Sequence, residues 1–139
     1  MSDTLWKKDQ EVDSWVIRFT VGDDHRWDQQ LLPYDVEATL AHVHGLVEIG
    51  VMTPEESAAV ESTLDSLLED YGSGEVVVRP EDEDCHTVIE NYLTDRLGET
   101  GRKVHTGRSR NDQVLAALRL FLRHELARIA ESSAILAGN

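Results

Sequence analysis

The residue types needed for a small anion-binding site are concentrated in nine consecutive residues, His105-Thr106-Gly107-Arg108-Ser109-Arg110-Asn111-Asp112-Gln113. Arg108 and Arg110 provide guanidinium groups, whose planar forks can pair with both oxygens of a carboxylate. Asn111 and Gln113 carry amides that donate and accept hydrogen bonds, which suits the orientation of a polar ligand. Gly107 permits a left-handed backbone or a close approach to a ligand. The 105–113 segment therefore predicts a carboxylate-binding corner.

The 105–113 segment lies directly before an apolar helical pattern that begins at Val114. Ser109, Asn111 and Asp112 are residue types favoured at helix starts. At such a start the free N–H groups and the helix dipole attract anions. An ordinary capped helix with two solvated arginines explains the same residues, so both interpretations stay open at this point.

Charge is divided unevenly along the 139 residues, whose formal net charge is -14. Residues 1–101 contain 6 Lys and Arg against 24 Asp and Glu, whereas residues 102–139 contain 7 against 3. The acidic majority repels phosphate backbones and anionic membranes, which argues against a general nucleic-acid or membrane binder. The basic excess after residue 101 instead favours a small anionic ligand near the 105–113 segment.

The elements that position this segment are helices, because apolar residues recur at helical spacing along most of the chain. We expect a first helix with Pro33 in its opening turn and Gly50 at its end. The capping box at 53–56 predicts the start of a second helix, which residues 72–74 stop. The expected fold class is all-α.

A third helix is expected after the acidic cluster 81–84, with Gly98 as its C-terminal cap and a loop at 98–101. The last helix carries an apolar stripe about four turns long. Its residues are Val114, Leu115, Leu118, Leu122, Leu126 and Ile129. So broad a stripe is typical of a helical bundle or an oligomer interface, and we expect that the chain stops within a longer protein.

Composition narrows the class of protein further. Cys85 is the single cysteine, which excludes an internal disulfide framework and suits a reducing compartment. No apolar run approaches the roughly 20 residues that span a bilayer, and residues 1–15 lack the apolar core of a secretory signal. The six histidines show no zinc-ligand spacing. We therefore expect a cytoplasmic protein with no metal, no membrane contact and no nucleic-acid partner.

Residues 105–114, HTGRSRNDQV, resemble the signature of argininosuccinate lyase in the aspartase/fumarase superfamily. Residues 83–86 are similar to the acidic-aspartate-x-histidine stretch of that family, and residues 101–105 to its connecting loop. The resemblance covers essentially the whole chain and is most specific between Asp82 and Phe121.

This resemblance implies a small helical N-terminal domain, residues 1–110, followed by the first part of a central helical bundle, residues 111–139. It also implies a homotetramer that cleaves argininosuccinate to arginine and fumarate by β-elimination, without a metal or organic cofactor. A base removes a proton beside a succinyl carboxylate, and the dianionic intermediate is stabilised by fixed N–H and guanidinium donors. The implied partner is a small dicarboxylate substrate.

The resemblance assigns substrate binding to six residues of this chain: Asn111, Arg110, Ser109, Thr106, His86 and Asp28. His86 matches a family histidine near the active site, although a capping or supporting role explains it as well. Asp28 is similar to the acidic residue that the family places near the amino-acid end of the substrate. His42 and His44 lie on opposing faces of one helix, and His25 and His124 are expected at the surface.

The chain departs from the family pattern in several places. A Trp-Gly-Gly-Arg-Phe motif is replaced by residues 15–19, WVIRF, no serine is evident at 22–24, and Ala117 stands where an acidic residue is common. The family regions that supply the catalytic histidine and serine are absent from the 139 residues. We therefore expect the chain alone to have no lyase activity.

Two functions of other classes compete with this interpretation. A catalytically inactive helical interaction module would use the apolar stripe of the last helix to pair with a partner. A nucleic-acid binder would use residues 102–110, but the acidic remainder and the lack of interleaved aromatic residues argue against it.

Overall fold

A computed structural model of the chain describes residues 15–16, 19 and 22–138. Between residues 22 and 138 its elements are α2 (Asp24–Glu48), α3 (Pro54–Ser73), η1 (Pro80–Asp82), α4 (Cys85–Leu97), α5 (Glu99–Lys103) and α6 (Arg110–Leu136). These described residues contain no strand, which confirms the all-α fold. Residues 1–14, Ile17, Arg18 and Asn139, which enter the sequence argument, lie outside the described residues. Among the helices described, none combines the length and apolar composition needed to cross a membrane.

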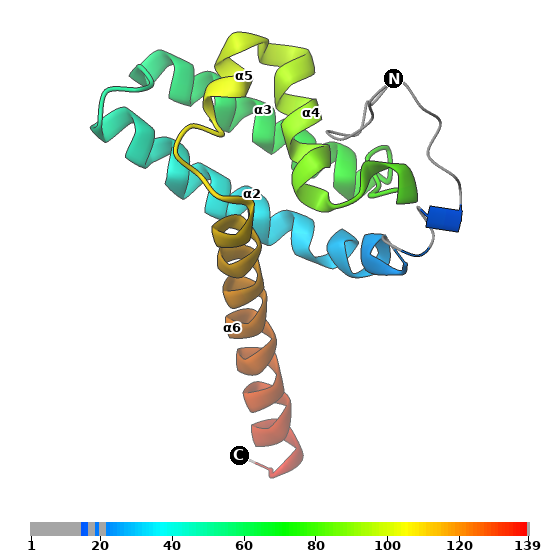
Figure 1. Cartoon of the computed structure of the whole chain (residues 1–139). Coiled ribbons are helices and arrows are strands. Elements are labelled where there is room, and N and C mark those ends of the chain that lie inside the picture. The colour runs from blue at the N-terminus through cyan, green and yellow to red at the C-terminus, as the bar shows by residue number, and fades with distance from the viewer. Residues whose placement is uncertain (1–14, 17–18, 20–21, 139) are drawn as a thin grey trace.

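α2 is the central element, because it contacts α3, α4 and α6. Figure 1 shows α3, α4 and α5 gathered on one side of α2. α6 starts beside α2 and projects away from the other helices as a long stalk, with the C-terminus at its far end (Figure 1). The start of α6 is therefore the part of this helix that lies against α2 and nearest to α3, α4 and α5.

α2 begins at Asp24, so the prediction that Pro33 lies in its opening turn is wrong. Inside a helix a proline has no N–H to donate to the carbonyl four residues earlier, which here belongs to Gln29. The hydroxyl of Tyr71 in α3 donates to that Gln29 carbonyl at 2.8 Å. The Tyr71 hydroxyl thus replaces the N–H donor that Pro33 lacks. The helix α2 continues past Pro33 to Glu48.

Tyr71→Phe is expected to lower the free energy of unfolding by about 1 kcal/mol, the net value of one hydrogen bond, because the Gln29 carbonyl loses this donor. Urea denaturation measures the change. Tyr34→Phe is the matched control, since the ring contacts of Tyr34 with Phe121 and His124 survive the loss of its hydroxyl. We expect a change within about 0.5 kcal/mol for that control. Equal losses in the two variants would contradict this account of Pro33.

α3 has the two ends that the sequence predicts. The hydroxyl of Thr53 accepts from the Glu56 N–H at 3.2 Å, and the Glu56 carboxylate accepts from the Thr53 N–H at 3.0 Å. This reciprocal pair is the expected capping box. Gly74, with φ of 82°, provides the left-handed residue that ends the helix.

The expected loop at 98–101 is instead the start of the short helix α5, so that prediction is wrong. Gly98 does end α4, and the chain turns directly into α5. Gly101 lies so close to α4 that a Cβ placed on it would be 2.5 Å from the Leu93 carbonyl oxygen. The missing side chain therefore allows α5 to pack against the backbone of α4.

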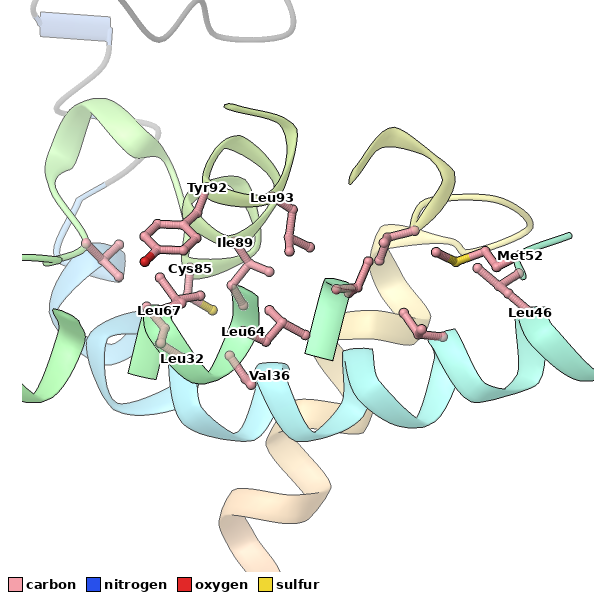
Figure 2. Close-up of a cluster of buried hydrophobic side chains, with 14 residues drawn as sticks. Leu32, Val36, Leu46, Met52, Leu64, Leu67, Cys85, Ile89, Tyr92 and Leu93 are labelled. Atoms are coloured by element: carbon pink, nitrogen blue, oxygen red, sulfur yellow. The ribbon is translucent and has the colours of Figure 1, made fainter. Parts of the chain in front are cut away.

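The hydrophobic core lies between α2, α3 and α4. In Figure 2 the side chains of Val36, Leu64 and Ile89, one from each helix, point toward one another. The fully or nearly fully buried apolar residues of this core are Leu32, Val36, Val43, Leu46, Met52, Val60, Leu64, Leu67, Cys85, Ile89, Leu93 and Val104. This core fixes the relative positions of the three helices on which the site described below is built.

α6 packs on α2 through its first half. Ala117 is fully buried, and Phe121 and His124 meet the Tyr34 ring edge-on with centroids 5.6 and 5.9 Å apart. The predicted apolar stripe is exposed, and its exposed residues include Leu115, Leu118, Leu122, Leu126 and Ile129. The proposed domain boundary after residue 110 coincides with the first turn of α6, and it stays a prediction.

Candidate functional site

The 105–113 segment forms a tight turn and the first turn of α6. Hydrogen bonds from the Thr106 N–H to the Lys103 carbonyl, 2.9 Å, and from the Arg108 N–H to the His105 carbonyl, 3.2 Å, hold the turn. Gly107 has a φ of 69°, the left-handed backbone that its residue type predicts. Ser109 is the N-cap residue of α6.

Arg108 points into the protein rather than toward solvent. Its side chain is 8% exposed, its Nη1 donates to the Thr39 hydroxyl at 2.8 Å, and its Nη2 lies 3.5 Å from Asp35 Oδ1. Burial lowers the pKa of the Arg108 guanidinium, and the Asp35 carboxylate opposes this shift. Arg108 thus anchors the segment through α2, which differs from the solvated fork that the sequence suggested.

Arg110 is held at the beginning of α4. Its Nη2 donates to the Thr87 hydroxyl at 3.0 Å, and its Nη1 lies 3.5 Å from Asp84 Oδ1. The Arg110 side chain is 33% exposed. Its contacts with α4 therefore fix the direction of the side chain, which stays partly exposed, although Nη1 is buried without a hydrogen-bond partner.

Three of the predicted site residues leave polar groups at the surface. Thr106, Ser109 and Asn111 are exposed, and the Ser109 hydroxyl makes no capping hydrogen bond. They lie at the N-terminus of the 27-residue helix α6, where the first N–H groups have no acceptor within the helix. An anion placed there would meet free N–H donors and the positive end of the helix dipole.

The first turn of α4 connects the remaining predicted residues. The Cys85 N–H donates to the Asp28 carboxylate at 3.2 Å, and the next residue, His86, hydrogen-bonds Asp35. Thr87 follows and accepts from Arg110. Asp28 and His86 are thereby linked to the 105–113 segment through consecutive residues of α4. His86 itself is only 2% exposed, and its role in substrate binding stays a prediction.

The residue at the centre of this arrangement is Asp35 of α2, which the sequence patterns did not mark as a site residue. Asp35 is fully buried, and its Oδ2 lies 2.6 Å from His86 Nδ1 and 3.0 Å from Gln113 Nε2. A signal was present in the sequence: Leu32, Asp35 and Thr39 share one helical face at spacings of three and four. A carboxylate on a core-facing stripe indicates a buried partner.

Three potential metal ligands, Asp35, Cys85 and His86, have donor atoms within 4.8 Å of one another. Their chemistry does not fit a metal site, however. Burial raises the pKa of the Cys85 thiol, and nearby carboxylates raise it further, which disfavours the thiolate that binds a metal. The Asp35 carboxylate already accepts from His86 and Gln113, beside the Arg108 cation. We assign this cluster to hydrogen bonding.

Two histidines lie at the turn, His42 beside it and His105 within it. His42 Nε2 lies 3.2 Å from the Thr106 carbonyl oxygen, and His105 Nε2 lies 3.3 Å from Glu90 Oε2. Burial lowers the pKa of His42 below its ordinary 6.5, and the Arg108 charge lowers it further. Burial also lowers the pKa of His105, although Glu90 opposes that shift. Both imidazoles are therefore favoured in the neutral form.

Because the pKa of His42 is lower in the folded chain than in the unfolded chain, its imidazole binds a proton more readily in the unfolded chain as the pH falls below about 6.5, and its contribution to the free energy of unfolding is expected to decrease. His42→Gln keeps an amide donor for Thr106 and removes the titration, which should make the decrease between about pH 7 and pH 5 shallower. Denaturant unfolding at several pH values measures this slope. His44→Gln, on the exposed side of α2, is the control. A slope unchanged by His42→Gln would contradict the assignment.

Comparison with known proteins identifies the family. The model of a family described as lyase matches residues 8–136, so the chain belongs to this lyase family. An argininosuccinate lyase of Thermotoga neapolitana is 49% identical over 131 residues, which cover 94% of this chain and 33% of that protein. An argininosuccinate lyase of Xanthomonas oryzae pv. oryzae (strain PXO99A) is 45% identical over 138 residues, 99% of this chain and 32% of that protein.

An argininosuccinate lyase of Sorangium cellulosum is 47% identical over 134 residues, 96% of this chain and 31% of that protein. These relatives confirm the resemblance that residues 83–86 and 105–114 predict. The chain spans about a third of the length of the curated relatives it matches.

Proposed function

We propose that this chain forms one part of the active site of an argininosuccinate lyase, which converts argininosuccinate to arginine and fumarate by β-elimination. One observation carries the proposal. Arg108 and Gln113 fasten the 105–113 segment to the protein interior, while Thr106, Ser109 and Asn111 between and beside them remain exposed. A segment that is rigidly anchored and polar on its outer side suits the recognition of a small anion.

The chemistry of the segment matches what such an elimination requires. Removal of a proton beside a carboxylate places a second negative charge on the substrate, and fixed donors stabilise that charge without reorganising. The first N–H groups of α6 provide such donors. Asn111 and Arg110 add a neutral and a charged donor, with Ser109 and Thr106 beside them. In this proposal His86 and Asp28 complete the substrate-binding group through the first turn of α4.

We propose further that the whole protein is a cytoplasmic homotetramer and that α6 contributes to the helical bundle of the assembly. The exposed apolar residues of α6 support this, because a stripe of this breadth is typical of bundle interiors. The catalytic histidine and serine that the family resemblance implies would then come from sequence outside these 139 residues. No cofactor is needed in this mechanism.

A growth experiment tests the proposed function. In a chimera, this chain replaces the aligned 131-residue segment of the Thermotoga neapolitana argininosuccinate lyase. We expect the chimera to restore growth without arginine to a bacterial strain that lacks argininosuccinate lyase. The 139-residue chain alone is expected to give no growth. A chimera that is expressed and assembles as a tetramer but gives no growth would contradict the proposal.

A catalytically inactive interaction module is the second candidate, and the same exposed stripe on α6 favours it. Light scattering on the purified 139-residue chain separates the two. A discrete small oligomer of the chain by itself supports the module. Concentration-dependent aggregation supports a helix that belongs in a larger bundle.

A further inference from the structure

We propose that Asp35 is a positioning residue that holds the 105–113 segment in its ligand-binding geometry. The inference rests on the proposed function of that segment and adds a residue to it. Asp35 lies 73 residues before Arg108 in the sequence and 78 before Gln113. No substrate contact is assigned to Asp35, because it is fully buried.

The two oxygens of Asp35 receive donors from both ends of the exposed part of the segment. Arg108 Nη2 lies 3.5 Å from Oδ1, and Gln113 Nε2 donates to Oδ2 at 3.0 Å. Residues 109–112 lie between these two anchors. The position of Ser109, Arg110 and Asn111 is thus fixed from both sides by one carboxylate.

His86 joins the same carboxylate to α4. His86 Nδ1 lies 2.6 Å from Asp35 Oδ2, and the neighbouring Thr87 holds Arg110. Asp35 therefore acts on Arg110 by a second path, through the first turn of α4. Three chain segments meet at one group: α4, the turn before α6, and α6 itself.

The burial of this carboxylate makes the arrangement sensitive to its charge. A buried carboxylate is tolerated only when its oxygens are occupied by donors or cations, and the partners of Asp35 are themselves buried or nearly so. Thr39 lies one turn further along α2, and its hydroxyl accepts a hydrogen bond from Arg108 Nη1 at 2.8 Å. Removing the charge of Asp35 leaves Arg108 buried without its counter-ion, which favours movement of the turn toward solvent.

Hydrogen exchange in the 139-residue chain tests this directly. The backbone N–H groups of Thr106, Arg108 and Gln113 donate to the carbonyls of Lys103, His105 and Ser109, so their exchange reports local opening of the turn and of the first turn of α6. Asp35→Asn keeps the shape of the side chain and removes its charge. We expect exchange at these three amides to become about 10-fold faster or more. The nitrogen-bound proton signal of His86 Nδ1 should shift as well, because the partner changes from a carboxylate to an amide.

Asp70→Asn is the matched control. Asp70 is also a carboxylate that joins two helices, since it accepts from the Tyr92 hydroxyl at 2.6 Å and lies 3.6 Å from Arg96. Its replacement should leave the exchange of the three segment amides and the His86 signal unchanged. The proposal is overturned if folded Asp35→Asn leaves these readouts at their original values, or if Asp70→Asn changes them equally.

Gln113→Leu provides an independent test that keeps the buried charge of Asp35. If Asp35→Asn fails to fold, this variant still tests whether Asp35 holds the segment. It deletes one anchor while His86 and Arg108 keep their contacts with Asp35. Exchange of the backbone N–H at position 113 is expected to become about 10-fold faster, while the His86 Nδ1 proton signal keeps its position. Unchanged exchange in Gln113→Leu would contradict the proposal that Asp35 holds the segment in place through Gln113.

Activity of the chimera separates this inference from the proposed function. With an active chimera, Asp35→Asn is expected to lower kcat/KM about 100-fold through misplacement of the segment, and Asp70→Asn to leave it within about twofold. An active chimera with unchanged kcat/KM in Asp35→Asn overturns the inference and leaves the function intact. An inactive chimera contradicts the function, and the exchange measurements on the 139-residue chain still decide the role of Asp35.

Discussion

Asn111→Ala in the chimera is expected to lower kcat/KM for argininosuccinate by about 10²–10³-fold, which corresponds to about 2.7–4 kcal/mol of transition-state stabilisation. Asn111 is exposed at the N-terminus of α6, where its amide can donate to the charge that develops during the elimination. Because the donor acts mainly on the transition state, the loss should fall on kcat rather than on KM alone. Steady-state kinetics of fumarate formation measure both constants.

The control for this variant is Ser62→Ala, which removes a polar group at an exposed position of α3. We expect it to leave kcat/KM within about twofold, since surface substitutions away from special features have small effects. Both variants should unfold at the same denaturant concentration as the unmodified chimera. If Asn111→Ala retains full activity, Asn111 does not contact the substrate and the assignment fails.

Leu64→Ala is expected to lower the free energy of unfolding of the 139-residue chain by about 2–5 kcal/mol. Leu64 is fully buried, and it lies between Val36 of α2 and Ile89 of α4 (Figure 2). The alanine loses the transfer free energy of the leucine side chain and leaves a cavity in a region that three helices hold together. Urea unfolding followed by helical circular dichroism gives the change.

Leu126→Ala makes the same chemical change on α6, where the side chain is 64% exposed. We expect it to change the unfolding free energy of the monomeric chain by no more than about 0.5 kcal/mol. Comparable losses in the two variants would show that the stability does not reside in the core between α2, α3 and α4. The measurement should be made at a chain concentration where light scattering shows a monomer.

The helix ends that were predicted correctly are those set by local chemistry. The pairing of Thr53 with Glu56 and the left-handed Gly74 need no partner from elsewhere in the chain, so the sequence reports them directly. The two predictions that were wrong concern positions whose local structure depends on a residue distant in the sequence or on another helix. Pro33 continues a helix because Tyr71 satisfies the Gln29 carbonyl, and residues 98–101 enter α5 because Gly101 packs on the backbone of α4.

The candidate site was predictable to the same extent. Residue types alone marked the 105–113 segment as a candidate site, although an ordinary capped helix explains the same residues, and the assignment of the site residues stays a prediction. They did not show that Arg108 turns inward to Asp35 and Thr39, which are 73 and 69 residues away. That pairing depends on how α2 packs against the start of α6, and the helical spacing of Asp35 was its only local sign.

The central claim is that this chain provides the substrate-binding corner of an argininosuccinate lyase. The most direct test is the initial rate of fumarate formation from argininosuccinate by the purified, tetrameric chimera, compared with the unmodified Thermotoga neapolitana enzyme under the same conditions. We predict turnover within about tenfold of the unmodified enzyme, since the site residues are kept and only their surroundings change. A folded tetrameric chimera that binds argininosuccinate but forms no fumarate, or that does not bind it at all, would contradict the account.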